Sequence, residues 1–460
     1  MPAGAIPPAA PTAAVGPGPL TGLIEGFYGR PWSWSARAEV LAFCHAHGLS
    51  HYVYAPKDDP LHRHDWRVPY PDADLDGFAG LVAAETMRIG FAVSPGLSID
   101  AHDPTDRAAL AAKVDQVVAT GIDLVCLALD DIPVRPGLGE EHAALTAWLA
   151  DHLGDGVRLV LVPTEYAGTR PTPYLDALAA GVPEEVAIAW TGPTVVCDEI
   201  TVGQAAARAE VLGGRAPLLW DNYPVNDAVM ADRLFMGPLR GRDPGLRDAC
   251  CGHLANPMVQ PRASLLPLAS VAAWVRGDDP EAAWRREADR RGWRAFAEAC
   301  DGEVPRRLVA DVVGTWDVPG RDDALARLEG WLDEAVGAEA PGLEEEAEAW
   351  REQVRAEAGL ARSAVALLRT LPPTPGLPFD HAGAVQHALL VGWVWREVAR
   401  SPVTVFGPRL SLRPVLAQWP DGEFAYRSAS LDQGRNAVDA LCRFALDRLA
   451  AATEAALPPP

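Results

Sequence analysis

Short, strongly apolar runs recur along the first 260 residues at a nearly regular interval, and this rhythm constrains the fold more than any other feature of the sequence. The runs begin 28 to 39 residues apart, which is the length of one strand, one helix and two connecting loops. Because a parallel strand buried on both faces is nearly continuous in apolar residues, the runs indicate a parallel sheet. The eight runs are GLIEGF (22–27), HYVYAP (51–56), GFAVSPG (90–96), LVCLALDD (124–131), RLVLVPTEY (158–166), VAIAWTGP (186–193), APLLWDN (216–222) and GHLANPM (252–258).

The segments between these runs have the apolar spacing and the end signals of helices. Ser35 is the expected N-cap of a helix that ends at Gly48, and another helix is expected over 139–153. Eight apolar strands that alternate with helices predict an α/β fold, a (β/α)8 TIM barrel. A doubly wound open sheet is the alternative, but no GxGxxG phosphate loop follows the first run.

The pattern of apolar residues changes near residue 280: they no longer form continuous runs and instead recur at helical spacing. Turn clusters rich in proline and glycine separate the later helical segments. We therefore expect a disordered Pro/Ala-rich arm over 1–20, the barrel over 21–280 and an all-α, bundle-like domain over 281–460.

Two details of the helical region can be predicted. The run from Glu344 to Glu346 is expected to form a solvated helix start, where acidic residues complement the helix dipole. Trp393 and Trp395 are two residues apart and would lie on different faces of a helix, so we expect at least one of them to be exposed.

The charge and the cysteine content narrow the classes of function. Acidic residues outnumber basic residues by 62 to 40, which gives a net charge of −22. Phosphate backbones and anionic lipid surfaces attract basic chains, so we expect no nucleic-acid partner and no membrane association. Seven cysteines without CxxC spacing, and an N-terminus without a secretory signal, favour reduced thiols and a cytoplasmic protein.

Polar and aromatic side chains follow the apolar runs, where the strands of a barrel open into a common mouth. They include no Ser-His-Asp set, cysteine nucleophile or metal cluster, so we expect neither a metal nor a cofactor. Carboxylates, amides and aromatic walls instead suit a neutral, polyhydroxylated ring such as a sugar. The residues are Gly26, Tyr28, Lys57, Asp58, Asp59, Ser94, Asp130, Asp131, Thr164, Glu165, Tyr166, Trp190, Thr191, Trp220, Asp221, Asn222 and Asn256.

The pair Asp130 and Asp131 is the sharpest of these signals. It follows the apolar run LVCLAL, so burial is expected to raise the pKa of both carboxyl groups, and their repulsion to separate the two values. One group then stays ionised while the other keeps a proton, which is what acid-catalysed glycoside cleavage requires. A helix cap or a loop salt bridge is the alternative interpretation of an Asp-Asp pair at a strand end.

Lysine, histidine and tryptophan add weaker signals. The chain has only two lysines, so the lysine kept in APKDD, Lys57, suggests a need for a compact ammonium. His62 and His64 have a spacing that a metal site could use, but exposed loop histidines are the expected interpretation. Two interpretations of Trp220 stay open: the side chain packs in the core, or it forms the wall of a pocket.

Taken together, the strand-end motifs resemble those of glycoside hydrolase family 84, the family of O-GlcNAcase and related β-N-acetylglucosaminidases. The resemblance covers about residues 21–275, and the motifs occur in the family's order. They are IEGFYGRPWS (24–33), YVYAPKDDPLHRHDWR (52–67), AVSPGLSID (92–100), LALDDI (127–132), VPTEYAGT (162–169), WTGPTVV (190–196), LLWDNYPVND (218–227) and ANP (255–257). The later helical region resembles the family's helical domain only loosely.

The resemblance implies a retaining, substrate-assisted mechanism, in which the substrate's 2-acetamido oxygen attacks the anomeric carbon and forms an oxazoline. Asp130 would orient the acetamido group, and Asp131 would act as general acid and then as general base. These roles suit adjacent residues only if the backbone bends just past the strand. By motif match, the sugar-binding residues are Gly26, Lys57, Asn222, Asp227 and Asn256 for the hydroxyls, and Tyr166 and Trp220 for the acetamido pocket.

The expected activity is therefore that of an exo-β-N-acetylglucosaminidase on a GlcNAc-bearing glycoside or glycoprotein. Protein O-GlcNAc, bacterial glycans and small glycosides all stay open as substrates, and a homodimer through the helical domain is a further expectation. One alternative is a catalytically inactive GlcNAc-binding protein, against which the intact Asp130, Asp131 and Tyr166 argue. The other is an endo-acting hyaluronan or chitin enzyme, which the acidic barrel and the missing DxxDxDxE signature make less suitable.

Overall fold

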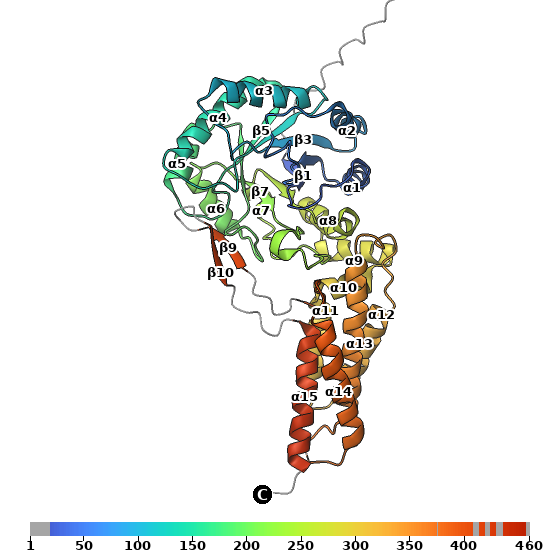
Figure 1. Cartoon of the computed structure of the whole chain (residues 1–460). Helices are drawn as coiled ribbons and strands as arrows, with labels where there is room; N and C mark the ends of the chain where they lie inside the picture. The colour runs from blue at the N-terminus through green and yellow to red at the C-terminus, as the bar shows by residue number, and fades with distance from the viewer. Residues whose placement is uncertain (1–18, 375, 408–413, 419–423, 429–435, 457–460) are drawn as a thin grey trace, which may run out of the picture.

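The first half of the chain forms a closed barrel of eight parallel strands with helices on its outside (Figure 1). The computed structural model describes residues 19–374, 376–407, 414–418, 424–428 and 436–456. The predicted barrel is confirmed, and the open sheet is excluded because the last strand pairs with the first, with Leu20 opposite Gly252. The strands are β1 Leu20–Glu25, β2 His51–Tyr54, β3 Arg88–Val93, β4 Leu124–Ala128, β5 Arg158–Val162, β6 Ala187–Trp190, β7 Leu218–Asp221 and β8 Gly252–Ala255.

The helices around the barrel begin close to where the sequence places them. The N-cap of α1 is Ser33 and not Ser35, because Ser33 has extended backbone and its Oγ accepts a hydrogen bond from the amide of Ala36 at 3.2 Å. Ser35 already lies inside the helix. The helices are α1 Trp34–Ala46, α2 Asp72–Ala83, α3 Pro104–Val118, α4 Leu138–Leu153, α5 Pro173–Gly181, α6 Val202–Val211, α7 Leu246–Ala249 and α8 Pro261–Arg276.

Two hydrophobic layers position the site. Side chains such as Val53, Cys126 and Leu218 form an inner cluster, while residues on the opposite faces of the strands pack with the helices in an outer cluster. Successive residues of one strand therefore belong to different layers. Trp220 belongs to the inner cluster and Trp190 to the outer one, although Trp190 is the last residue of β6 and Trp220 the last but one of β7.

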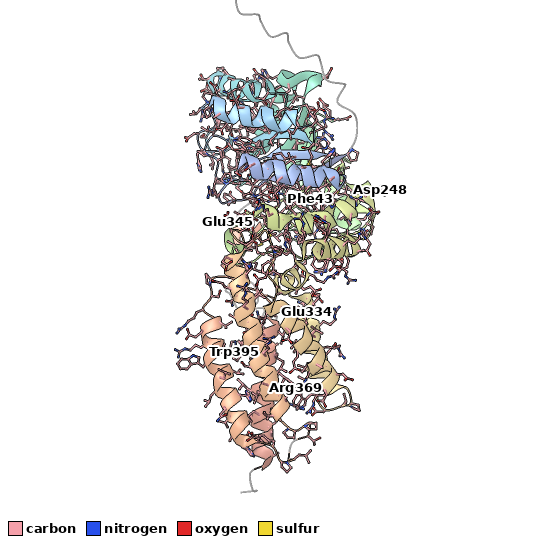
Figure 2. The ribbon with its side chains drawn as sticks, turned by 90° about the vertical axis from the view of Figure 1, so that its right-hand side faces the viewer. Phe43, Asp248, Glu334, Glu345, Arg369 and Trp395 are labelled. Atoms are coloured by element: carbon pink, nitrogen blue, oxygen red, sulfur yellow. The ribbon has the colours of Figure 1, made fainter. Side chains whose placement is uncertain are left out.

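The helical region extends away from the barrel as an elongated bundle (Figures 1 and 2). A two-stranded antiparallel hairpin, β9 Pro414–Gln418 and β10 Phe424–Ser428, interrupts it and was not anticipated from the sequence. The expected arm over 1–20 lies mostly outside the described residues, and the division of the chain near residue 280 stays a prediction. The helices are α9 Pro280–Arg291, α10 Arg294–Asp301, α11 Glu303–Gly314, α12 Arg321–Val336, α13 Glu348–Thr370, α14 His381–Val398 and α15 Ala437–Ala456.

The two regions share packing where they meet. Met236 and Met258 follow barrel strands, yet they belong to the same buried cluster as Trp284 and Trp293 of the helical region. Trp284 Nε1 also donates a hydrogen bond to the carbonyl oxygen of Met236 at 2.6 Å. The bundle therefore rests on side chains that the barrel loops supply.

The acidic run before α13 contributes to this junction. One oxygen of Glu346 accepts hydrogen bonds from the amides of Arg262 and Ala263 at 2.9 and 3.1 Å, in the first turn of α8. The interpretation of this run as a solvated helix start is thus wrong for Glu346, whose half-buried carboxylate complements the N-terminus of a different helix. Figure 2 shows the neighbouring Glu345 at the junction, while Arg369 and Trp395 lie farther along the bundle.

The tryptophans of α14 separate as predicted. Trp393 is 74% exposed, whereas Trp395 Nε1 donates to Asp439 Oδ1 of α15 at 2.6 Å. All seven cysteines are free thiols. Within the part of the chain that the structure describes, no helix combines the length and the apolar character needed to cross a bilayer.

Candidate active site

Asp130 and Asp131 lie just after β4, at the end of the barrel where the other strands also finish. Asp131 has a φ of +55°, in the left-handed region, so the backbone bends at the point where the predicted roles require it. Asp130 is 5% exposed, and its Oδ2 accepts a hydrogen bond from Lys57 Nζ at 2.5 Å. Its Oδ1 is buried without a hydrogen-bond partner among the described residues. The site thus holds a carboxylate with one anchored oxygen and one unused oxygen.

The carboxylate of Asp131 is surrounded by donors. Tyr28 Oη donates to its Oδ2 at 2.7 Å, and Tyr166 Oη donates to its Oδ1 at 2.9 Å. Burial acts to raise the pKa of Asp131, but the Lys57 ammonium, the two hydroxyls and the Arg63 guanidinium together hold this pKa below its ordinary value. The expectation that burial raises the pKa of both carboxyls is therefore wrong for Asp131, because the donors outweigh desolvation.

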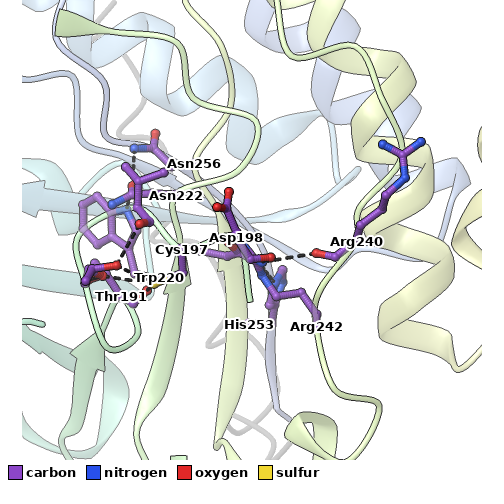
Figure 3. Close-up of polar contacts among 12 residues, drawn as sticks. Thr191, Cys197, Asp198, Trp220, Asn222, Arg240, Arg242, His253 and Asn256 are labelled. Carbon is purple, nitrogen blue, oxygen red and sulfur yellow. Dashed lines mark hydrogen bonds and ion pairs between the residues drawn. The ribbon is translucent and has the colours of Figure 1, made fainter. Parts of the chain in front are cut away.

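An amide cluster lies where β7 and β8 end, formed by Asn222 and Asn256 beside Trp220 (Figure 3). Asn256 Oδ1 accepts from the amide of Gly26 at 3.1 Å, and Asn256 Nδ2 donates to Asn222 Oδ1 at 3.0 Å. Asn222 Oδ1 also accepts a hydrogen bond from Trp220 Nε1 at 2.9 Å. Asn222 Nδ2 donates to the carbonyl oxygen of Val195 at 2.7 Å. This cluster fixes the orientation of both amides beside an aromatic wall.

Gly26, which directly follows β1, and the loop after β7 complete the arrangement. A Cβ on Gly26 would lie 2.3 Å from Cζ2 of Trp220, so only glycine leaves room for the indole here. Asp227 Oδ2 accepts a hydrogen bond from the amide of Tyr28 at 2.8 Å, and burial raises the pKa of Asp227 above its ordinary value. These contacts place Gly26 and Trp220 beside Asn256. They also connect Asp227 to Asp131, because Tyr28 donates a hydrogen bond to each.

Several strand-end residues do not join this group. Asp221 points away from it, because Arg242 binds both of its oxygens at 2.8 and 2.9 Å and His253 Nε2 lies 3.1 Å from Oδ2. Trp190 lies in the outer core, where its Nε1 donates to Gly168 O at 2.9 Å. Each of these side chains faces the opposite side of its strand from the residues of the site.

Two further strand-end groups form local contacts. Glu165 accepts a hydrogen bond from the Oγ1 of Thr172, the N-cap residue of α5. His62 is fully buried instead of exposed as expected, with Nδ1 2.8 Å from the carbonyl of Ala92, and burial lowers its pKa to about 3. Among the described residues, no group of three or more His, Cys, Asp or Glu side chains could hold a metal ion.

One residue near the carboxylates was not singled out by the sequence. Arg63, in the segment after β2, donates from Nη1 to Tyr28 Oη at 2.6 Å and lies 3.9 Å from Asp131 Oδ2. Arginine is abundant in this chain, and Arg63 follows no strand directly, so no sequence signal distinguishes it.

A TIM barrel whose mouth holds an adjacent carboxylate pair, an amide cluster and an aromatic wall is an arrangement typical of glycoside hydrolases. The sequence pattern of the beta-N-acetylglucosaminidase family matches residues 21–301, and the chain belongs to this family. The family predicted from the strand-end motifs is therefore confirmed.

Known proteins are similar to this chain over different extents. The Protein O-GlcNAcases of Rattus norvegicus and Mus musculus are each 33% identical over 277 residues, which is 56% of this chain and 30% of theirs. The chain thus aligns with less than a third of the length of these relatives. An O-GlcNAc hydrolase mutant from Thermobaculum terrenum superposes with a TM-score of 0.76 at 23% identity, covering 92% of this chain and 94% of that chain, which supports the fold alone.

Proposed function

We propose that the chain is a retaining exo-β-N-acetylglucosaminidase that removes terminal β-linked GlcNAc by substrate-assisted catalysis. The observation that carries this proposal is the unused, buried Oδ1 of Asp130 beside the bend at Asp131. A buried carboxylate oxygen without a partner is costly to the folded protein, so its persistence points to a ligand donor that satisfies it. The membership of the family supports the same activity.

Asp130 is proposed to accept the N–H of the substrate's 2-acetamido group. Lys57 anchors Oδ2 at 2.5 Å, so the carboxylate cannot rotate freely and Oδ1 keeps one direction. A fixed acceptor turns the acetamido oxygen toward the anomeric carbon, which lowers the entropic cost of the attack. The same negative charge stabilises the positive charge that develops on the oxazoline ring.

Asp131 is proposed to be the general acid and then the general base. As the acetamido oxygen bonds to the anomeric carbon, the glycosidic C–O bond breaks and the proton of Asp131 goes to the leaving oxygen. Water then adds to the anomeric carbon of the oxazoline, and its proton returns to Asp131 while the acetamido group re-forms. The surrounding donors hold the pKa of Asp131 below its ordinary value and keep it ionised. We propose that the bound sugar draws a tyrosine hydroxyl away, which raises this pKa and lets Asp131 carry the proton.

The remaining residues of the site are proposed to bind the sugar. Tyr166 and Trp220 are assigned to the acetamido pocket, one as a hydrogen-bond donor and one as an apolar wall. Amide, ammonium and carboxylate groups offer the paired donors and acceptors that sugar hydroxyls need. The residues assigned to the hydroxyls are Gly26, Lys57, Asn222, Asp227 and Asn256.

Replacing the acetyl group of a 4-nitrophenyl β-N-acetylglucosaminide by fluoroacetyl groups tests the mechanism. Each fluorine withdraws electron density from the attacking carbonyl oxygen, so kcat/KM should fall steadily with fluorine number. Proton NMR of the first product should detect the β-anomer. A rate insensitive to fluorine, or an α-anomer first, would contradict the mechanism.

The same assay separates the other functions that the sequence left open. GlcNAc binding without turnover by the folded wild type would favour an inactive binding protein. Cleavage confined to hyaluronan or chitin chains would favour an endo-acting enzyme. Turnover of the 4-nitrophenyl monosaccharide substrate supports the exo-acting enzyme.

A further inference from the structure

The barrel loop over residues 226–233, which carries Asp227, is held in part by the helical region. The carbonyl oxygen of Asp232 in this loop accepts two hydrogen bonds, from Nε1 of Trp350 at 3.0 Å and from the amide of Thr404 at 2.8 Å. The hydroxyl of Thr404 also donates to Oδ2 of Asp232 at 2.8 Å. Three donors of the helical region therefore converge on one residue of the loop.

These donors are fixed by the packing of the helical region itself. Trp350 of α13 is 8% exposed and belongs to the buried cluster of the bundle. Thr404 precedes Val405 and Phe406, which are fully buried in the same cluster. The amide of Phe406 donates to the carbonyl oxygen of Ala299 at 2.7 Å, which ties this segment to α10. The donors therefore hold Asp232 at a place that the helical region determines.

Asn226 connects the two ends of the loop. Its side chain is buried, and its Nδ2 donates to the carbonyl oxygen of Arg233 at 2.8 Å. Its Oδ1 accepts from the amide of Val259 at 3.0 Å, so the amide group is oriented from both sides. Asn226 directly precedes Asp227, and Arg233 directly follows Asp232. A displacement of Asp232 would therefore also displace the residue next to Asp227.

The loop has little of its own to hold its conformation. A single turn of 3-10 helix, Ala228–Met230, follows Asp227 directly. Ala228 has a φ of +47°, in the left-handed region that a residue with a Cβ rarely adopts, so this conformation is strained. Its neighbour Val229 is exposed, so it adds little apolar burial to offset the strain. Strained backbone persists where surrounding contacts impose it, and the hydrogen bonds to Asp232 are contacts of this kind.

We propose that Trp350 and Thr404 are positioning residues for substrate binding. They hold Asp232, and through the loop they keep Asp227 in the place from which it binds a sugar hydroxyl. This inference rests on the proposed role of Asp227 as a sugar-binding residue. Asp227 is held at its other side by the amide of Tyr28, 2.8 Å from its Oδ2. The helical region then contributes to the affinity for the substrate without touching it.

The paired variant Trp350→Phe/Thr404→Val tests the proposal. Thr404→Val keeps the shape of the side chain and Trp350→Phe keeps an aromatic ring, while each removes a side-chain donor to Asp232. On 4-nitrophenyl β-N-acetylglucosaminide, KM should rise about five- to tenfold and kcat should stay within about twofold, the pattern of a lost binding contact. In an Asp227→Ala background the same pair should raise KM little further, because the binding group is already absent.

Amide hydrogen exchange gives a direct readout of the loop. Residues 226–233 should exchange faster in the paired variant than in the wild type, because the loop opens more readily. Thr404→Ser keeps the hydroxyl and should keep the KM of the wild type. Trp331→Phe is a matched control, since Trp331 is also 8% exposed and its Nε1 donates to Glu298 Oε2 at 2.8 Å within the helical region. It should change neither the KM nor the exchange of the loop.

Several outcomes would overturn the proposal. An unchanged KM in the paired variant, additive increases of KM with Asp227→Ala, or the same increase in Trp331→Phe would each contradict a path through the loop. A wild type that cleaves no glycoside would instead contradict the proposed function itself, so the two failures are distinguishable. If the paired variant does not fold, Thr404→Val and Thr404→Ser still supply the comparison of KM and of loop exchange.

Discussion

The barrel and the helical region both bury carboxylates, but they use them differently. In the helical region, Glu357 is fully buried and its oxygens accept from Gln353 Nε2 at 2.8 Å and from Asn436 Nδ2 at 3.4 Å. In the barrel, Asp130 is also buried, yet one of its oxygens has no partner among the described residues. A satisfied buried carboxylate joins parts of a fold, whereas an unsatisfied one indicates a place for a ligand.

The same contrast exists within the barrel. Asp221 accepts from Arg242 and His253, and Glu25 of β1 accepts two hydrogen bonds from Arg37, both at 2.8 Å. These two carboxylates are as buried as Asp130, but all their contacts join a strand to neighbouring elements. Burial alone therefore does not distinguish the site, and the unused oxygen does.

The largest expected effect comes from exchanging the two kinds of aspartate for asparagine. Asp130→Asn should lower kcat by about 10³-fold on aryl and methyl glycosides alike, because it removes the charge that stabilises the oxazoline. Asp221→Asn should instead cost about 3–5 kcal/mol of unfolding free energy, because it leaves the buried Arg242 without its charge partner. Steady-state kinetics and urea unfolding of both variants measure the two effects.

The stability of Asp130→Asn is the control for this exchange. Lys57 loses its direct partner, but Asp131 stays close enough to offset part of its charge, so the loss of stability should be smaller than for Asp221→Asn. An Asp130→Asn protein that is active and unfolds easily would reverse the assignment of the two carboxylates.

A pair of glycines sharpens the comparison between the two regions. Gly26→Ala should lower kcat/KM about tenfold or more, because its Cβ would lie 2.3 Å from Trp220 and displace the wall of the pocket. Gly330→Ala in α12 meets open space and should stabilise the protein by about 0.5–1 kcal/mol without changing the kinetics. Kinetics and thermal unfolding of the two variants check this, and equal kinetic losses in both would argue against the packing explanation.

We expect buried histidines of the barrel to make the stability of the protein depend on pH. Burial lowers the pKa of three barrel histidines, to about 4 for His51 and His142 and to about 3 for His62. The unfolded chain then takes up protons near pH 6.5 before the folded chain does, so stability is lost as pH falls from about 6.5 toward 4. Each histidine contributes up to about 1.4 kcal/mol per pH unit in this window.

Urea unfolding at several pH values between 7 and 4.5 measures this slope. His142→Gln removes one of the three titrations and should reduce the slope by about one histidine's share. A stability that rises on acidification over this range would contradict the buried, neutral state of these histidines.

The smallest expected effect on activity concerns the exposed face of α14. Val385, Leu389 and Trp393 are 50%, 70% and 74% exposed, and the homodimer expected through the helical region would cover such a surface. Substituting Leu389 and Trp393 by glutamate should convert a dimer to a monomer in analytical ultracentrifugation while leaving glycoside cleavage unchanged. A wild type that sediments as a monomer would refute the dimer.

The barrel and the family could be predicted from the sequence because each strand lies in a nearly continuous apolar run that is followed by its own motif. The pair Asp130 and Asp131 was found because it follows such a run directly. The roles of the pair require a bend just past the strand, and the positive φ of Asp131 provides it. The roles of the individual site residues stay proposals.

What could not be predicted depends on side-chain direction and on contacts distant in sequence. Trp190 and Asp221 are the last residues of their strands and Trp220 is the last but one of its strand, and a difference of one residue turns a side chain to the other layer. Arg63 meets Tyr28 across 35 residues of sequence, which no local pattern reveals. Contacts of this kind also lower the pKa of Asp131, whereas burial alone, which the apolar run before it indicates, predicts a raised pKa.

The most direct test of the account is release of 4-nitrophenol from its β-N-acetylglucosaminide by the wild type and by Asp131→Asn across a range of pH. The account predicts turnover by the wild type, and a variant that loses the basic limb and keeps part of its rate, since this leaving group needs little protonation. On the methyl glycoside the same variant should be almost inactive. A folded wild type that binds GlcNAc without releasing 4-nitrophenol would contradict the account.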